Sequence, residues 1–152
     1  MRFSDRAEAA RALASALSAY RGQHPLVLAI PRGAVPMGRA LADALGGELD
    51  VVLVRKLGAP WNPELAVGAI DETGWAYIAD YARSTGADEA DLEKEKQAQR
   101  KILRARRAQF TPHRAPIDPG GRIAIVLDDG LATGATMIAA LHAVRAKRPQ
   151  RR

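Results

Sequence analysis

The amino-acid sequence predicts an α/β fold in which a parallel, doubly wound sheet is flanked by helices. Three short apolar runs, at residues 26–30, 51–54 and 123–127, are typical of strands that are buried on both faces of such a sheet. The first two enclose a helical pattern, and strand, helix and strand within about 30 residues form a βαβ unit. Because 152 residues suffice for one hydrophobic core, a single domain over 1–152 is expected.

Two helices are predicted in the first third of the chain. The first covers residues 4–20, where Asp5 and Glu8 have the spacing of a capping box and apolar residues then recur at helical intervals. The second covers residues 35–45, and the two glycines that follow it are a typical stop signal. This second helix is the connection of the predicted βαβ unit.

The middle of the chain predicts a β-hairpin and a long helix. Residues 57–63 contain one glycine and two prolines, so we expect a loop there. Apolar residues at 65–70 and 75–78 flank a turn-like Asp-Glu-Thr-Gly sequence, which predicts the hairpin. Residues 88–110 carry acids in their first half and bases in their second, an arrangement that stabilises a helix through its dipole.

The composition excludes several classes of function. The chain has no cysteine, so disulfides, thiolate catalysis and cysteine-ligated zinc are excluded. No apolar run approaches the roughly 20 residues that cross a bilayer, so a cytoplasmic protein without a membrane partner is expected. The net charge of +6 favours an anionic partner. Nucleic acid is not expected, because aromatic residues that could stack on bases are few.

The strongest functional pattern follows the run at 123–127. Two acids, Asp128 and Asp129, precede a loop of small residues that leads into a helical pattern. Ligands of open α/β sheets bind at this edge, where strands end and helices begin. Glycines in such a loop let successive N–H groups point at a phosphate, and Thr133 and Thr136 can add hydroxyl donors.

An acid pair beside a phosphate requires compensation, because like charges repel. A sugar phosphate resolves the conflict, since the loop would hold the phosphate while the acids accept from ribose hydroxyls or hold the water molecules of Mg²⁺. The simpler alternative is that the acids only cap the turn that follows.

The segment Ile125–Thr136 resembles the signature of the type I phosphoribosyltransferases, which is a hydrophobic strand, two acids and a small-residue loop that ends in threonine. The resemblance implies that the protein binds 5-phosphoribosyl-1-pyrophosphate with Mg²⁺, and transfers the phosphoribosyl group to a nitrogenous base. Asp128 and Asp129 would hold the ribose hydroxyls and, through water, the metal ion. The loop residues that would hold the 5-phosphate are Gly130, Leu131, Ala132, Thr133, Gly134, Ala135 and Thr136.

Two earlier segments resemble other parts of the same family. Pro31, Arg32, Gly33 and Ala34 resemble the loop that binds pyrophosphate, and Arg55 and Lys56 resemble a basic pair at the end of the next strand. The resemblance implies catalytic roles for Arg32, Lys56 and Asp129, and a lid formed by the hairpin. Taken alone, the first segment is more typical of a structural turn, and the basic pair is equally typical of a solvated strand end.

The sequence departs from the family in two ways. Some members, notably purine salvage enzymes, have an aspartate where this chain has Ala132, which argues against a close purine-salvage analogue. After the helix expected at 133–147 no further strand follows, so we expect the C-terminal strands to be missing, by truncation or because a partner subunit completes the sheet. An unpaired sheet edge favours a homodimer. A regulatory module that senses 5-phosphoribosyl-1-pyrophosphate without turnover, and an unrelated phosphate-binding α/β protein, are the alternatives.

Overall fold

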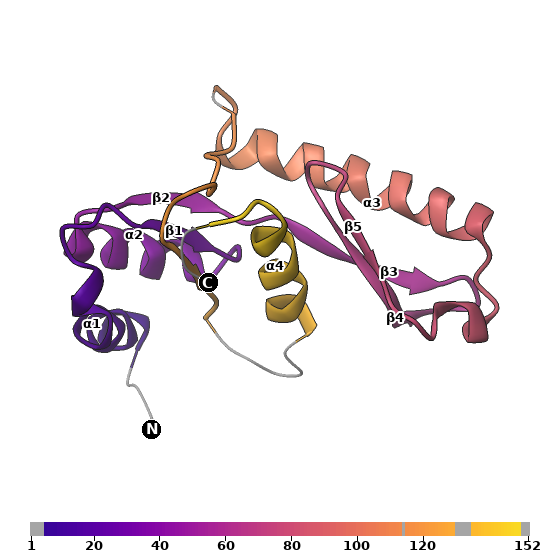
Figure 1. The fold of residues 1–152 in the computed structure, drawn as a ribbon, viewed down its shortest axis with the longest axis horizontal. Helices are drawn as coiled ribbons and strands as arrows, with labels where there is room; N and C mark the ends of the chain where they lie inside the picture. The colour runs from indigo at the N-terminus through magenta and orange to yellow at the C-terminus, as the bar shows by residue number, and fades with distance from the viewer. Residues whose placement is uncertain (1–4, 114, 130–134, 150–152) are drawn as a thin grey trace. The chain divides into compact units, whose positions relative to one another are not determined.

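The computed structural model describes residues 5–113, 115–129 and 135–149. They belong to two compact units (Figure 1). The first falls within residues 1–52, 116–132 and 144–152, and the second within 53–115 and 133–143. Each unit has its own sheet. The single domain expected from the sequence stays a prediction.

A parallel sheet of three strands, in the order β2-β1-β6, forms the centre of the first unit. Its strands are β1 (Leu26–Ala29), β2 (Glu48–Val51) and β6 (Ala124–Leu127). The helix α2 (Ala34–Leu45) connects β1 to β2, as the βαβ pattern predicts. It ends at Gly46, whose φ of 67° is a conformation that favours glycine. The predicted α/β fold with a parallel sheet flanked by helices is therefore confirmed.

The core of the first unit lies between this sheet and two helices. The first helix is α1 (Arg6–Ala16), followed by the 3₁₀ turn η1 (Ser18–Tyr20), and it packs against α2 (Figure 1). Asp5 caps α1 by accepting a hydrogen bond of 2.8 Å from the backbone N–H of Glu8, as its spacing predicts. Burial of each large apolar side chain contributes roughly 1.5–3 kcal/mol. The buried cluster contains Ala10, Val27, Ala29, Ala34, Met37, Leu41, Ala42, Leu45 and Leu127.

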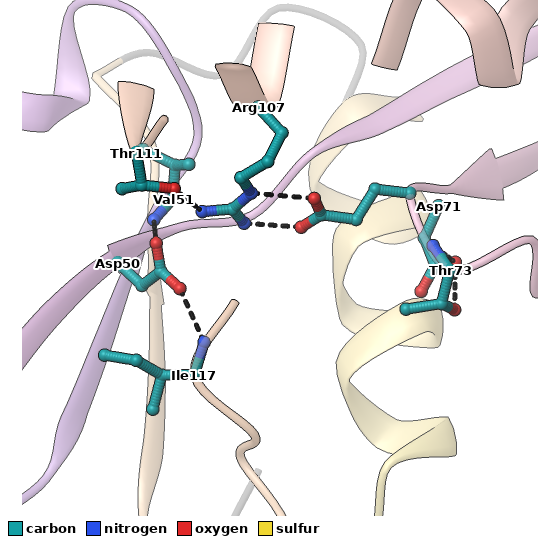
Figure 2. A network of polar contacts seen from close by, with 8 residues as sticks. Asp50, Val51, Asp71, Thr73, Arg107, Thr111 and Ile117 are labelled. Carbon is teal, nitrogen blue, oxygen red and sulfur yellow. Dashed lines mark hydrogen bonds and ion pairs between the residues drawn. The ribbon is translucent and has the colours of Figure 1, made fainter. Parts of the chain in front are cut away.

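The second unit contains an antiparallel sheet in the order β3-β4-β5. Its elements are β3 (Val54–Ala59), β4 (Asn62–Asp71), β5 (Ala76–Ile78), the 3₁₀ turn η2 (Ala82–Thr85) and α3 (Glu89–Phe110). The predicted hairpin is confirmed, and Asp71 fixes its turn. One carboxylate oxygen of Asp71 accepts from the backbone N–H of Thr73 at 2.9 Å (Figure 2). The same oxygen accepts from the backbone N–H of Trp75 at 3.1 Å. Such a turn is typical of aspartate.

Two predictions about residues 51–63 were wrong. The apolar run 51–54 is not one strand, because β2 ends at Val51 and Val54 already begins β3 of the other sheet. The segment 57–63 is mostly strand rather than loop. Gly58 lies at an irregularity in the β3-β4 register, where a Cβ would be 2.7 Å from the carbonyl oxygen of Pro63. Glycine therefore marks a bulge and a close approach of two strands here, and not a chain break.

The long helix α3 lies against β3 and β4 and is attached to them by polar contacts. Arg107 donates through Nε to Glu72 at 2.7 Å and also through Nη2, and its Nη1 donates to Thr111 at 2.9 Å (Figure 2). At the other end of the sheet, Glu95 accepts from the backbone N–H of Gly58 at 3.0 Å. The ion pair of Arg107 and Glu72 is largely buried, with side chains 12% and 14% exposed.

A buried carboxylate attaches the segment before β6 to the first unit. Asp50 accepts from the backbone N–H of Val51 at 2.8 Å and from that of Ile117 at 2.9 Å (Figure 2).

The last element is the helix α4 (Ala135–Ala146). Among the residues that the structure describes, no helix has the length and apolar character that a bilayer crossing requires.

Candidate ligand-binding site

The acid pair lies at the carboxyl end of β6, where the sequence predicts a site. Because β1 and β6 are neighbouring parallel strands, the segments that follow them emerge at the same edge of the sheet. A hydrogen bond of 2.8 Å from the backbone N–H of Ile30 to the carbonyl of Leu127 continues the pairing up to that edge. The strands thus bring together two segments that are far apart in the sequence.

Asp129 lies directly against the segment that follows β1. A Cβ at position 33 would be 1.9 Å from Oδ2 of Asp129 and 2.7 Å from its Cγ, so any larger residue would require this carboxylate or the loop to shift. Gly33 has a φ of −61°, which any residue adopts, and the glycine is therefore needed for space rather than for conformation. The peptide bond between Pro31 and Arg32 is cis. The structure brings two of the three predicted segments into contact.

Arg6 joins this site, and sequence reasoning missed it. Its Nη2 donates to Oδ2 of Asp129 at 2.9 Å, and the same Nη2 would be 2.9 Å from a Cβ at position 33. The contact joins residues that are 123 positions apart. One sequence signal was available, because a cation in the first turn of a helix faces the positive end of its dipole and is unusual there.

The two acids have opposite electrostatic environments. The hydrogen bond from Arg6 lowers the pKa of the Asp129 carboxyl below its ordinary value. Burial raises the pKa of the Asp128 carboxyl, and the neighbouring Asp129 charge acts in the same direction. A hydrogen bond of 2.8 Å from the backbone N–H of Asp129 to Oδ1 of Asp128 links the two residues. The Asp129 carboxyl therefore keeps its charged form to a lower pH than the Asp128 carboxyl does.

The pair also fits a hard cation, although only in part. Carboxylate oxygens are ligands that Mg²⁺ prefers, and one or two carboxylates with water and phosphate oxygens complete its usual shell. Within the described ranges, no group of three or more acidic, histidine or cysteine side chains could hold a metal ion. The metal-binding role of Asp128 and Asp129 stays a prediction.

The predicted basic pair is divided between the two faces of β3. Arg55 donates through Nε to the side chain of Gln99 on α3 at 2.7 Å, so it faces that helix. Lys56 is exposed and lines a cavity on the other face, since successive strand residues point to opposite sides. In the described part of the chain, no hydrogen bond or ion pair involves the Lys56 ammonium group. The binding role of each residue stays a prediction.

The cavity beside Lys56 has a volume of about 180 Å³. Small residues form much of its wall, and the exposed side chains of Tyr77, Tyr81 and Ile138 also line it. The Tyr77 ring stacks on the ring of His142, with centroids 4.8 Å apart and planes at 8°. The stack fixes the ring of Tyr77, which lines the cavity.

The remaining predicted site residues are only partly described. Arg32 is exposed, and Ala34 is the buried first residue of α2. The predicted phosphate-loop residues 130–134 lie outside the described residues. Ala135 and Thr136 are the first two residues of α4, as expected for residues at the start of a helix that follows such a loop.

The comparisons with known proteins agree with this arrangement. The family model described as "Phosphoribosyl transferase domain" matches residues 4–151. Two curated proteins from two strains of Mycobacterium tuberculosis, each named "Putative phosphoribosyl transferase", are 43% identical over 145 residues, which is 95% of this chain and 33% of theirs.

A solved structure from Thermus thermophilus is 46% identical, with a TM-score of 0.87 over 99% of this chain and 72% of that one. The chain thus spans about a third of the length of the curated relatives. A family match over nearly all of the sequence, together with a parallel sheet whose edge carries the acid pair, shows that the chain belongs to the phosphoribosyl transferase domain family.

Proposed function

We propose that this protein binds 5-phosphoribosyl-1-pyrophosphate with Mg²⁺ and transfers its phosphoribosyl group to a nitrogenous base, with release of pyrophosphate. The observation that carries the proposal is the contact of the Asp129 carboxylate with Gly33. This contact places the carboxylate, which can accept hydrogen bonds from hydroxyl groups, beside the loop at the amino end of α2. The backbone N–H groups at that end of a helix favour an anion. A ligand with vicinal hydroxyls and a pyrophosphate matches both halves of this site.

The roles follow from charge. Asp129 accepts a hydrogen bond from a ribose hydroxyl, and Asp128 accepts from the other or from a water molecule. Residues 31–34 hold the pyrophosphate through backbone N–H groups and the Arg32 guanidinium. The loop 130–134 and the first turn of α4 hold the 5-phosphate at the positive end of the helix dipole. Lys56 contributes a further cation for the leaving group.

In the reaction, the bond between C1 of the ribose and the pyrophosphate oxygen breaks, and its electron pair leaves with pyrophosphate. The nitrogen of the base forms the new bond to C1 and gives its proton to solvent or to a general base. Positive charge develops on the sugar, so stabilisation of the leaving group and the nearby carboxylates lowers the barrier. Bound Mg²⁺ would neutralise part of the pyrophosphate charge, held by Asp128 and Asp129 through water.

Titration calorimetry with 5-phosphoribosyl-1-pyrophosphate and Mg²⁺ tests the binding step. We expect saturable binding that weakens by about tenfold or more in Asp129→Asn, because one charged hydrogen bond is lost. Asp43→Asn is the matched control, since Asp43 is an exposed acid near the opposite end of α2 from Gly33. It should bind as the wild type does. Absence of binding by the wild type would sink the proposal.

Pyrophosphate release tests turnover separately. Incubation with 5-phosphoribosyl-1-pyrophosphate and a panel of purines, pyrimidines and other amines should release pyrophosphate with at least one acceptor. The alternative is a module that senses the same ligand without turnover, and it is favoured by Ala132 in place of the aspartate that purine salvage members carry. Tight binding without release for any acceptor supports that alternative.

A further inference from the structure

Arg6 lies at a position where an arginine does not stabilise its own helix. It is the first residue of α1, where the partial positive charge of the helix end disfavours a guanidinium. Its side chain is 63% exposed, so no packing requirement explains an arginine there. A residue that breaks a local rule is expected to have a compensating role elsewhere.

The compensating contact lies in the proposed ligand site. Nη2 of Arg6 reaches Oδ2 of Asp129 at 2.9 Å, and Gly33 lies against the same oxygen. The packing of α1 on α2 brings the first turn of each helix to this point. Two neighbours thus lie against one oxygen of the Asp129 carboxylate and restrict the orientation of the group.

We propose that Arg6 is a positioning residue of the ligand site, which holds the Asp129 carboxylate against Gly33 in the orientation that accepts from a ribose hydroxyl. This inference rests on the proposed function. It differs from two simpler roles. An ordinary exposed ion pair contributes little and would not affect the ligand. A placeholder that the ligand must displace would weaken binding, so its removal would strengthen it.

A double-mutant cycle separates these roles, with the dissociation constant of 5-phosphoribosyl-1-pyrophosphate with Mg²⁺ measured by calorimetry on the full chain. Arg6→Ala should weaken binding by about tenfold, because the carboxylate loses its fixed orientation. In the Asp129→Asn background, Arg6→Ala should cause no further loss, since Arg6 acts through that carboxylate. Arg6→Lys should recover part of the affinity, because it keeps the charge but lacks the planar fork.

Arg11→Ala is the matched control, since Arg11 is an exposed arginine of the same helix, and it should bind as the wild type does. The inference is overturned if Arg6→Ala binds as well as or better than the wild type, or if its loss is fully additive with Asp129→Asn, as loosening of α1 would be. If Arg6→Ala does not fold, Arg6→Lys takes its place in the cycle. It should bind more weakly than the wild type, and it should cause no further loss of affinity in the Asp129→Asn background. A wild type that binds nothing overturns the proposed function itself, and this inference with it.

Discussion

Asp129 presses its Oδ2 so closely on the backbone of Gly33 that even a methyl group has no room between them. A Cβ at position 33 would be 1.9 Å from that oxygen. The loop after β1 and the Asp129 carboxylate after β6 are therefore in direct contact, and a side chain at position 33 would displace one of them.

Gly33→Ala tests this packing. We expect the carboxylate or the loop to shift, and the affinity for 5-phosphoribosyl-1-pyrophosphate to fall by about tenfold or more. Gly46→Ala is a useful contrast, because its φ of 67° strains alanine although no atom lies near its Cβ. It should lower the free energy of unfolding by about 1 kcal/mol and leave the affinity unchanged. Equal affinities for Gly33→Ala and wild type would contradict the packing argument.

Successive side chains of β3 point to opposite faces of the sheet, so replacement of Arg55 and of Lys56 should have different effects on stability and on ligand binding. Arg55→Ala loses the hydrogen bond to Gln99, so it should lower the free energy of unfolding by about 1 kcal/mol with little effect on ligand affinity. Lys56→Ala should weaken ligand binding with little effect on the free energy of unfolding. Lys56 lines the cavity, and its proposed role is that of a cation for the leaving group. Denaturant unfolding and calorimetry of both variants check the pair. The idea fails if the two variants lose affinity equally.

The ion pair of Arg107 and Glu72 should be important for the attachment of α3. Arg107→Ala leaves Glu72 largely buried without this partner, and we expect the free energy of unfolding to fall by about 3 kcal/mol. Arg104→Ala is the control, since Arg104 is an exposed residue of the same helix, and it should change stability by less than about 0.5 kcal/mol. Denaturant unfolding followed by circular dichroism measures both.

The double variant Arg107→Met with Glu72→Leu should recover much of this loss, because no unpaired charge remains buried. A loss in the double variant equal to that of Arg107→Ala would instead assign the effect to packing of the long side chain. Arg107 also bonds to Thr111, so recovery is not expected to be complete.

The Glu48 carboxyl should titrate below its ordinary pKa. The hydrogen bond from Arg122 at 2.7 Å is the main cause, and the nearby His24 adds to the lowering of the pKa. The folded pKa lies below the unfolded value of 4.5, so this pair stabilises the fold above that pH. The contribution is lost as the pH falls through the folded value. This contribution to stability is small, because the Glu48 side chain is 44% exposed and the solvent screens the pair.

Titration of Glu48 by nuclear magnetic resonance, in the wild type and in Arg122→Gln, measures this shift. The pKa should rise in Arg122→Gln, and it should rise less in His24→Gln, because Arg122 is the larger cause. A Glu48 pKa that does not change in Arg122→Gln would contradict the assignment.

Sequence patterns predicted the sheet of the first unit because its strands are buried on both faces. The runs 26–30 and 123–127 have no polar residue that would interrupt them, so both strands were found within one residue of their bounds. The same rule failed at 51–54. There, two strands of different sheets meet in one apolar run, and apolarity alone carries no information on hydrogen-bond partners.

The candidate site was predictable as a motif but not as a geometry. Asp128 and Asp129 are found from their place after a strand. The contact of Arg6 with Asp129 is different, because an ion pair across 123 positions leaves no local pattern. The role of Gly33 also depends on a neighbour that only the fold supplies. Local sequence patterns therefore identify the acids and Gly33 as site residues, but they miss Arg6 and the contacts that join these residues.

The order of strands has a consequence for how the chain folds during synthesis. The central strand β1 receives its second partner only when residues 124–127 emerge from the ribosome, about 100 residues later. The strands β3, β4 and β5 follow one another along the chain, so their antiparallel contacts are local and form quickly. A nascent chain thus holds a finished hairpin sheet while one edge of β1 is still open. In that interval the edge is exposed to strand pairing with other chains, and chaperone capture is most useful there.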